Sequence, residues 1–253
     1  TRGILLVSLS GLRTLLPNPK VFERSQVSLK VGQEYDSDTL TKQLITIGYQ
    51  KVSQVISPGE FSRRGDILDI YEITQELPYR LEFFGDDIDG IRKFNPETQT
   101  SFEQVEELLV YPASDLIFEV SDFQRGIEHL EEALKTAKTE KKAYLEDLLA
   151  VSKDGFKHSD IRKFQSLFYE KEWTLLDYIP KGTPLFFDDF QKLVDKNARF
   201  DLEVANLLTE DLQQGKALSN LHYFADNYRD FRHYKPATFF SNFHKGLGLS
   251  LIH

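Results

Sequence analysis

Arg64, Arg80 and Phe84 are the residues of this sequence with the clearest potential for binding chemistry. Arginine and aromatic side chains are the usual anchors of protein interfaces, because one makes charge-assisted hydrogen bonds and the other buries a large apolar area. In the strand-like run YRLEFF, alternation directs Leu81 and Phe83 to a core and places Arg80 and Phe84 on the opposite face. Arg64 ends the preceding strand-like stretch and could join them. One interpretation of the pattern is a protein-binding surface.

A purely structural interpretation fits the same pattern. Arg64 and Arg80 could pair with the nearby acids Asp66 or Glu82, and Phe84 could pack under a helix. The alternation of side chains alone favours neither interpretation.

The sequence contains few features that would support catalysis or cofactor binding. The chain has no cysteine, which excludes disulfides, a thiolate nucleophile and Cys-rich zinc sites. Its histidines form no HExxH motif, and the Gly-Lys pairs at 181–182 and 215–216 lack the rest of a phosphate loop. The run GDDIDG at 85–90 would place Pro96 where a calcium loop needs glutamate, so we expect an acidic hairpin turn. We expect no catalytic, cofactor-binding or metal-binding residue in this chain.

Two further clusters have a functional and a structural interpretation. Asp188 and Asp189 end an apolar strand-like run, where helicase-like folds place metal-binding acids, but a polar strand end is the favoured interpretation. Two basic clusters could contact a phosphate backbone, although solvated surfaces are favoured for both. The first comprises Lys153, Lys157, His158, Arg162 and Lys163, and the second Arg229, Arg232, His233 and Lys235.

Composition narrows the class of protein. The 253 residues carry a formal charge of -9, which disfavours a dedicated nucleic-acid binder, and no apolar run reaches the ~20 residues of a membrane span. We expect a cytoplasmic, monomeric protein. The chain contains no methionine, which suggests an excised fragment.

The elements that position the candidate surface form an α/β fold. We predict three parts: residues 1–25 as the tail of a degenerate helicase-like domain, 26–118 as a small α+β domain with an antiparallel sheet, and 119–253 as a helix-rich segment. Periodicity predicts a helix from Asp36 to Gly48, followed by strands near 66–71, 79–84 and 88–94. Outside this domain, residues 3–9 and 184–190 are predicted strands. The middle part reads as an insertion, so the first and last parts should pack together.

Several blocks closely resemble the UvrA-binding domain shared by the excision-repair protein UvrB and the transcription-repair coupling factors. They are PGEFSRRGDILDIY (58–71), LPYRLEFFGDDIDGIRKFNPETQTS (77–101) and YPAS (111–114). Residues 125–134, 167–189 and 243–248 resemble the helicase-like segment that follows. The sequence LPYRLEFF is closer to that of the coupling factors than to that of UvrB. The sequence Asp-Asp-Phe-Gln at 188–191 also departs from the Asp-Glu-Ser-His of UvrB.

The resemblance implies a module that recruits UvrA where RNA polymerase has stalled, with no chemistry of its own. The family's UvrA-contact residues fall on Arg64, Arg80 and Phe84. ATP, magnesium, double-stranded DNA and RNA polymerase would be bound by other parts of the parent translocase. The alternatives are a fragment of UvrB itself, an ATP-dependent damage-recognition protein, and a DNA-binding module. We expect Arg80→Ala and Phe84→Ala to abolish UvrA binding without lowering the melting temperature.

Overall fold

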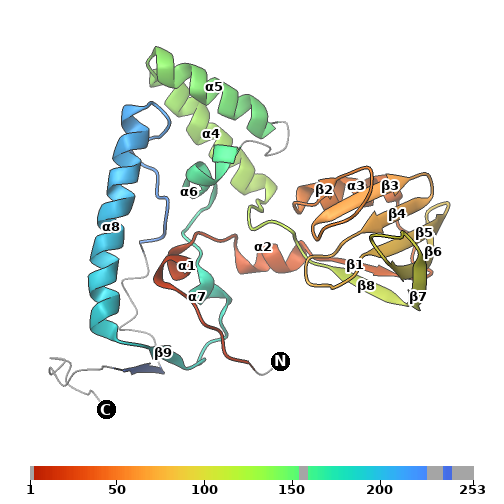
Figure 1. The fold of residues 1–253 in the computed structure, drawn as a ribbon. Helices are drawn as coiled ribbons and strands as arrows, with labels where there is room; N and C mark the ends of the chain where they lie inside the picture. The colour runs from red at the N-terminus through yellow and green to blue at the C-terminus, as the bar shows by residue number, and fades with distance from the viewer. Residues whose placement is uncertain (1–2, 154–158, 227–235, 241–253) are drawn as a thin grey trace. The chain divides into compact units, whose positions relative to one another are not determined.

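A computed structural model describes residues 3–153, 159–226 and 236–240 of the chain (Figure 1). The contacts divide it into two compact units, of which the first is discontinuous in sequence. Unit 1 comprises Thr1–Leu16 and Asp122–His253, and unit 2 comprises Pro17–Ser121. The division therefore falls after residue 16, nine residues before the predicted boundary at 25, and after residue 121, three residues beyond the predicted boundary at 118. The predicted α/β fold with a small antiparallel sheet is confirmed.

Unit 2 is built on a six-stranded sheet in which neighbouring strands follow the chain order (Figure 1). Its strands are β2 (Gln50–Lys51), β3 (Glu60–Arg64), β4 (Ile67–Ile70), β5 (Tyr79–Phe84), β6 (Asp87–Phe94) and β7 (Ser101–Val105). All pairs are antiparallel except β2 with β3. Two-residue turns join β3 to β4 and β5 to β6, so these two pairs form tight hairpins.

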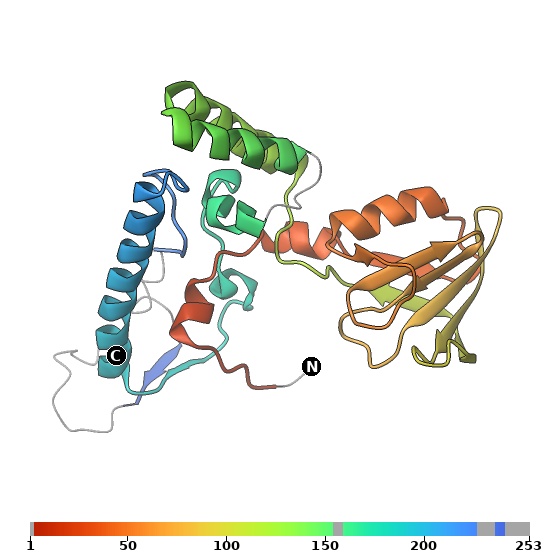
Figure 2. The same cartoon turned by 45° about the horizontal axis from the view of Figure 1, so that its top comes forward.

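Helix α3 (Ser37–Thr46) covers one face of this sheet, as the two views show (Figures 1 and 2). Asp36 caps it by accepting hydrogen bonds from the first backbone amides, and Gly48 follows its end at φ +96°. Leu40 and Leu44 are buried in one cluster with the inward side chains of the sheet. The helix predicted from Asp36 to Gly48 is confirmed, and the opposite face of the sheet is left free of it.

Strands β1 (Val27–Lys30) and β8 (Glu107–Val110) form a separate antiparallel pair near the two ends of unit 2. Val27 lies opposite Val110, and the inward side chains of both strands join the same core. A short helix, α2 (Pro19–Arg24), precedes β1. The first and last strands of unit 2 are therefore hydrogen-bonded to each other.

Unit 1 is mainly helical. Its longer helices are α4 (Val120–Thr136), α5 (Thr139–Lys153) and α8 (Phe190–Gln213), and its shorter elements are α1 (Leu9–Arg13), η1 (Ser159–Phe164), α6 (Gln165–Phe168) and α7 (Leu175–Tyr178). Strands β9 (Leu185–Phe187) and β10 (Ala237–Phe239) form a two-stranded parallel sheet.

Arg13 joins the two sequence segments of unit 1. Its guanidinium is buried, donates to Asp201 at 2.7 Å and to the Ala225 carbonyl at 3.1 Å, and lies 4.9 Å from the Phe200 ring centroid. A buried guanidinium needs such partners, because an unpaired charge in a protein interior is costly. The expected packing of the first residues on the last part of the chain is present at this position.

A second buried polar cluster surrounds Asp211 on α8. Tyr223 donates to it at 2.6 Å and the Lys163 ammonium at 3.1 Å. Burial raises the pKa of the Asp211 carboxyl, but the hydrogen bonds from Tyr223 and Lys163 outweigh it, so the net pKa is lowered. This cluster links α8 to η1 through one ionised carboxylate.

The predicted buried strand at residues 3–9 is wrong. Residues 3–8 adopt no regular structure, Leu9 begins α1, and the apolar side chains from Ile4 to Val7 are exposed. An apolar run forms a strand only where a partner strand supplies hydrogen bonds, and no described residue pairs with this segment. The strand predicted at 184–190 is present but shorter, as β9.

Candidate protein-binding surface

Phe84 is the last residue of β5 and lies on the solvent side of the sheet. It pairs with Asp87 across the β5–β6 hairpin, whose tight turn begins with Gly85 at φ +63°. Its side chain is 81% exposed. The interpretation in which Phe84 packs under a helix is therefore excluded. A large aromatic side chain left in water at the end of a rigid strand is a candidate contact for another molecule.

The alternation predicted for β5 is confirmed. Tyr79, Leu81 and Phe83 are buried, whereas the side chains between them are partly or fully exposed. A register shift against β6 falls between Glu82 and Phe83. The shift leaves the alternation of β5 intact, so its outward side chains share one face.

Arg80 makes an ion pair within the sheet. Its Nε and Nη2 donate to the two carboxylate oxygens of Asp69 at 2.8 and 2.9 Å, and Nη1 donates to the Gln99 carbonyl at 3.2 Å. The guanidinium also lies 4.7 Å from the centroid of the Phe94 ring. The structure thus pairs Arg80 with a chain acid, as the structural interpretation expected, but the acid is Asp69 on β4 rather than Asp66 or Glu82.

The pair changes what a mutation at Arg80 should do. The side chain of Asp69 is 3% exposed and that of Arg80 is 18% exposed. Removal of the guanidinium would leave a buried carboxylate without its counter-ion. The expectation that Arg80→Ala spares the melting temperature is therefore corrected. The hydrogen bond to Asp69 also raises the pKa of Arg80, so the group stays charged at all accessible pH.

Arg64 ends β3 and is exposed, with no ion pair or side-chain hydrogen bond among the described residues. It pairs across the sheet with Ile67 of β4, and Ile67 in turn pairs with Glu82 of β5. Because the sheet is antiparallel here, directly opposite residues point to the same face. Arg64 and Ile67 therefore lie on the same face as the outward side chains of β5. The three site residues predicted from sequence come from one region of the sheet.

Ile67 is the residue on this face that sequence reasoning missed. It is 39% exposed, although the neighbouring Leu68 and Ile70 are fully buried. The signal was present in the run DILDI, where strict alternation sets Ile67 and Asp69 against Leu68 and Ile70. We call the residues Arg64, Ile67 and Phe84 the β3–β5 surface.

The first basic cluster is largely neutralised where it is described. Lys153 pairs with Glu131 at 2.8 Å, and Lys163 pairs with Asp211. Lys157 and His158 lie outside the described residues, as do all four members of the second cluster at 229–235 and the block at 243–248. The two lysines of this cluster that the structure describes are therefore paired with acids of the chain.

Asp189 has a structural role at the start of α8. It is the N-cap residue, with φ +48°, and pairs with Lys192 at 2.8 Å. Its carboxylate also stabilises the helix dipole at its positive end. Asp189 is therefore a polar residue that follows the strand, as the favoured interpretation expected, and it also caps the next helix.

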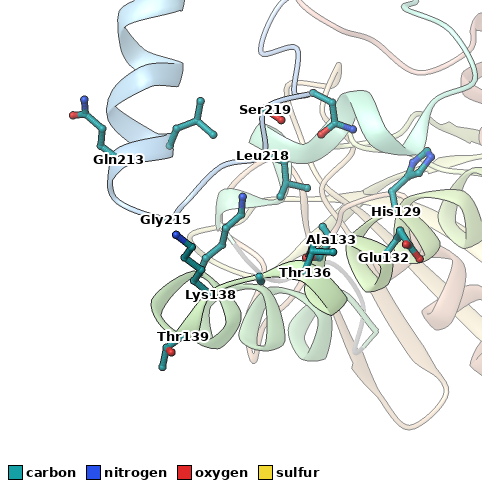
Figure 3. A pocket seen from close by; sticks show the side chains of 14 residues that line it. His129, Glu132, Ala133, Thr136, Lys138, Thr139, Gln213, Gly215, Leu218 and Ser219 are labelled. Carbon is teal, nitrogen blue, oxygen red and sulfur yellow. Dashed lines mark hydrogen bonds between the residues drawn. The ribbon is translucent and has the colours of Figure 1, made fainter.

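A pocket of about 870 Å³ lies within unit 1, between the α4–α5 turn and the residues that follow α8 (Figure 3). His129, Glu132, Thr136 and Lys138 line it, together with Gly215 and the residues after it. The His129 Nδ1 atom lies 2.9 Å from the Leu167 carbonyl oxygen. None of the hydroxyl groups that line the pocket is hydrogen-bonded to this histidine in the described structure.

The described residues form neither a metal-binding cluster nor a membrane-spanning helix. No group of three or more His, Asp or Glu side chains in the described ranges is arranged to hold a metal ion. Among the same residues, no helix has the length and apolar character that a membrane crossing requires.

Comparison with known proteins places the β3–β5 surface in a known family domain. Residues 27–116 match the UvrB interaction domain. The chain is 33% identical to the transcription-repair-coupling factor of Bacillus subtilis (strain 168) over 86% of its length. It is 29% identical to that of Staphylococcus aureus (strain MRSA252) over its whole length. It spans about a fifth of the length of these relatives. Residues 27–116 therefore form a UvrB interaction domain, and the chain as a whole is similar to a part of the transcription-repair-coupling factors, as its sequence blocks predicted.

Proposed function

We propose that this chain recruits the excision-repair protein UvrA to a transcription-repair-coupling factor, through the β3–β5 surface of its UvrB interaction domain. One observation carries the proposal: Phe84 is 81% exposed at the end of β5, on the same sheet face as Arg64, which is exposed and has no ion pair among the described residues. An aromatic side chain with a neighbouring guanidinium is the usual composition of an interface hot spot.

The two residues would contribute differently. Phe84 would enter an apolar depression on the partner, where it loses its contact with water. Arg64 would donate charge-assisted hydrogen bonds to a carboxylate at the edge of that depression. Since Arg64 has no ion pair to break within the described chain, its binding to a partner acid sacrifices no existing interaction.

Arg80 would have a mixed role. Three of the five N–H groups of a guanidinium are already used, two by Asp69 and one by Gln99. The remaining two could reach a partner, while the ion pair fixes β4 against β5 beneath the surface. Loss of Arg80 would therefore weaken binding both directly and through the fold.

We also propose that the chain acts without catalysis of its own. A nucleotide-driven activity, with ATP and magnesium, would belong to other parts of the longer protein, as would binding of RNA polymerase and double-stranded DNA. The relatives carry the name of coupling factors, which favours this role over that of a UvrB fragment. An ATPase rate of the purified chain above background would contradict the proposal.

Isothermal titration of purified UvrA with this chain tests the recruitment role. We expect saturable binding by the wild type and a loss of roughly 10- to 150-fold in affinity for Arg64→Glu, since a hydrogen bond to a charged group contributes about 1.5–3 kcal/mol. Lys42→Glu is the matched control, because Lys42 is also an exposed cation but lies on α3. Equal affinities of the wild type and Arg64→Glu, or no binding by the wild type, would overturn the proposal.

A further inference from the structure

We propose that Ile67 is a second apolar anchor of the β3–β5 surface, so that the partner binds across three strands rather than along β5 alone. The inference rests on the proposed function, because it concerns the same partner. It adds a residue that determines the width of the contact and the chemistry of the partner's matching surface.

The register of the sheet places Ile67 between the two residues already identified. Arg64 lies directly opposite it on β3, and Glu82 lies directly opposite it on β5. Phe84 is two residues beyond Glu82 on the same face, which makes it the diagonal neighbour of Ile67 at ~7–8 Å between backbones. An aromatic ring and an isoleucine at this spacing can be covered by one apolar surface.

Glu82 could have covered Ile67, but it is directed to the other side. Glu82 Oε2 lies 3.7 Å from Arg92 Nη2 and would lie 3.6 Å from a Cβ atom added at Gly90. Gly90 is the β6 residue opposite Glu82 and has no side chain, so the carboxylate occupies the space above it. Glu82 is therefore not directed over Ile67, which is 39% exposed.

The strand ends that carry these residues are held rigidly. The Phe83 amide donates to the Asp66 carbonyl at 2.8 Å, which joins the start of β4 to the end of β5. Leu68 and Leu81 lie opposite each other in the core directly beneath. A surface already ordered in the free protein pays little conformational entropy on binding.

These positions specify the matching surface on the partner. It needs an apolar strip that spans two neighbouring strands, ~4.8 Å apart, to cover both Ile67 and Phe84. It needs a carboxylate on the β3 side, where Arg64 has no ion pair among the described residues, and no cation for Glu82, whose carboxylate lies 3.7 Å from Arg92. The proposed partner surface is therefore an apolar strip with an acid on the β3 side.

Titration of UvrA with two Ile67 variants tests the inference. We expect at least a tenfold loss of affinity for Ile67→Asp, and about a three- to tenfold loss for Ile67→Thr, whose β-branched side chain suits a strand. Ile45→Asp is the matched control, since Ile45 is 46% exposed but lies on α3, which covers the other face of the sheet. Affinity for the control should stay within about twofold of the wild type.

The outcomes separate the two proposals. Failure of the wild type to bind UvrA would overturn the recruitment role itself. Binding by the wild type with unchanged affinity of both Ile67 variants would overturn only the role of Ile67. An equal loss for Ile45→Asp would also overturn it, because the effect would not be local. A melting temperature of Ile67→Thr close to that of the wild type excludes misfolding as the cause of a loss.

Discussion

Truncation of Phe84 to alanine gives the clearest test of the β3–β5 surface, because it changes binding without touching the core. The side chain is 81% exposed in the free chain. A phenylalanine buries ~200 Å² when fully covered, so a partner could remove about 160 Å² more from water, worth about 4 kcal/mol at ~25 cal/mol per Å². Alanine retains its Cβ and area-based values are upper limits, so we expect a loss of about 2–3 kcal/mol, or roughly 30- to 150-fold in affinity.

Calorimetric titration against UvrA measures this loss directly, and a thermal melt of the same sample reports the fold. We expect the melting temperature to stay within about 2 °C of the wild type, because exposed side chains contribute little to stability. Phe102→Ala is the matched control: Phe102 is 59% exposed on β7 of the same sheet, away from the β3–β5 surface. Full affinity of Phe84→Ala, or an equal loss for Phe102→Ala, would refute the reasoning.

Three further predictions concern the packing that supports the two units. Arg80→Ala should lower the free energy of unfolding by about 3 kcal/mol, because Asp69 is left charged and buried. Urea denaturation measures this loss, and an unchanged midpoint would show that the ion pair contributes nothing to stability. Asp211→Asn should cost about 1–3 kcal/mol at pH 7. The folded pKa of Asp211 lies below its unfolded value, so its stabilisation is complete above pH ~4 and fades as pH falls through the folded pKa. Melts from pH 7 to pH 3 should therefore narrow the difference between wild type and variant, and a constant difference would contradict this. Gly126→Ala should destabilise by about 1–3 kcal/mol although alanine favours helices, because its Cβ would overlap the Phe168 ring; a raised melting temperature would disprove it.

The sequence predicted the elements of unit 2 well because its signals are local. Asp36 and Gly48 mark the ends of α3 by capping chemistry, which depends only on neighbouring residues. Alternation in β5 correctly assigned Leu81 to the core and Phe84 to the surface. For such features the residue type and its immediate spacing determine the outcome.

The partner of Arg80 could not be predicted in the same way. Alternation indicates which face a side chain occupies, but not which residue lies opposite on the next strand. Asp69 pairs with Arg80 because the loop between β4 and β5 sets a register that aligns them. That register follows from the whole sheet rather than from a short pattern.

The exposed residues Ile4–Val7 show that an apolar run alone does not predict a buried strand. Their apolar character predicted burial, yet burial requires a surface to pack against, and the described chain offers no neighbouring strand. Ile67 shows the converse: the alternation in DILDI already sets it on the face opposite to Leu68 and Ile70, so its exposure follows from a local pattern.

The pairing of β1 with β8 has a consequence for the order in which the chain folds. The backbone that leaves unit 1 after Leu16 returns at Asp122, and Val27 lies opposite Val110 near those crossings. Once unit 2 has formed, the more than one hundred residues between the two segments of unit 1 behave as a short loop. Its closure costs about 1–1.5 kcal/mol less than that of the open chain, since each doubling of loop length costs ~0.6 kcal/mol. Early folding of the inserted unit should therefore accelerate assembly of the discontinuous one, and an unfolded insert should retard it.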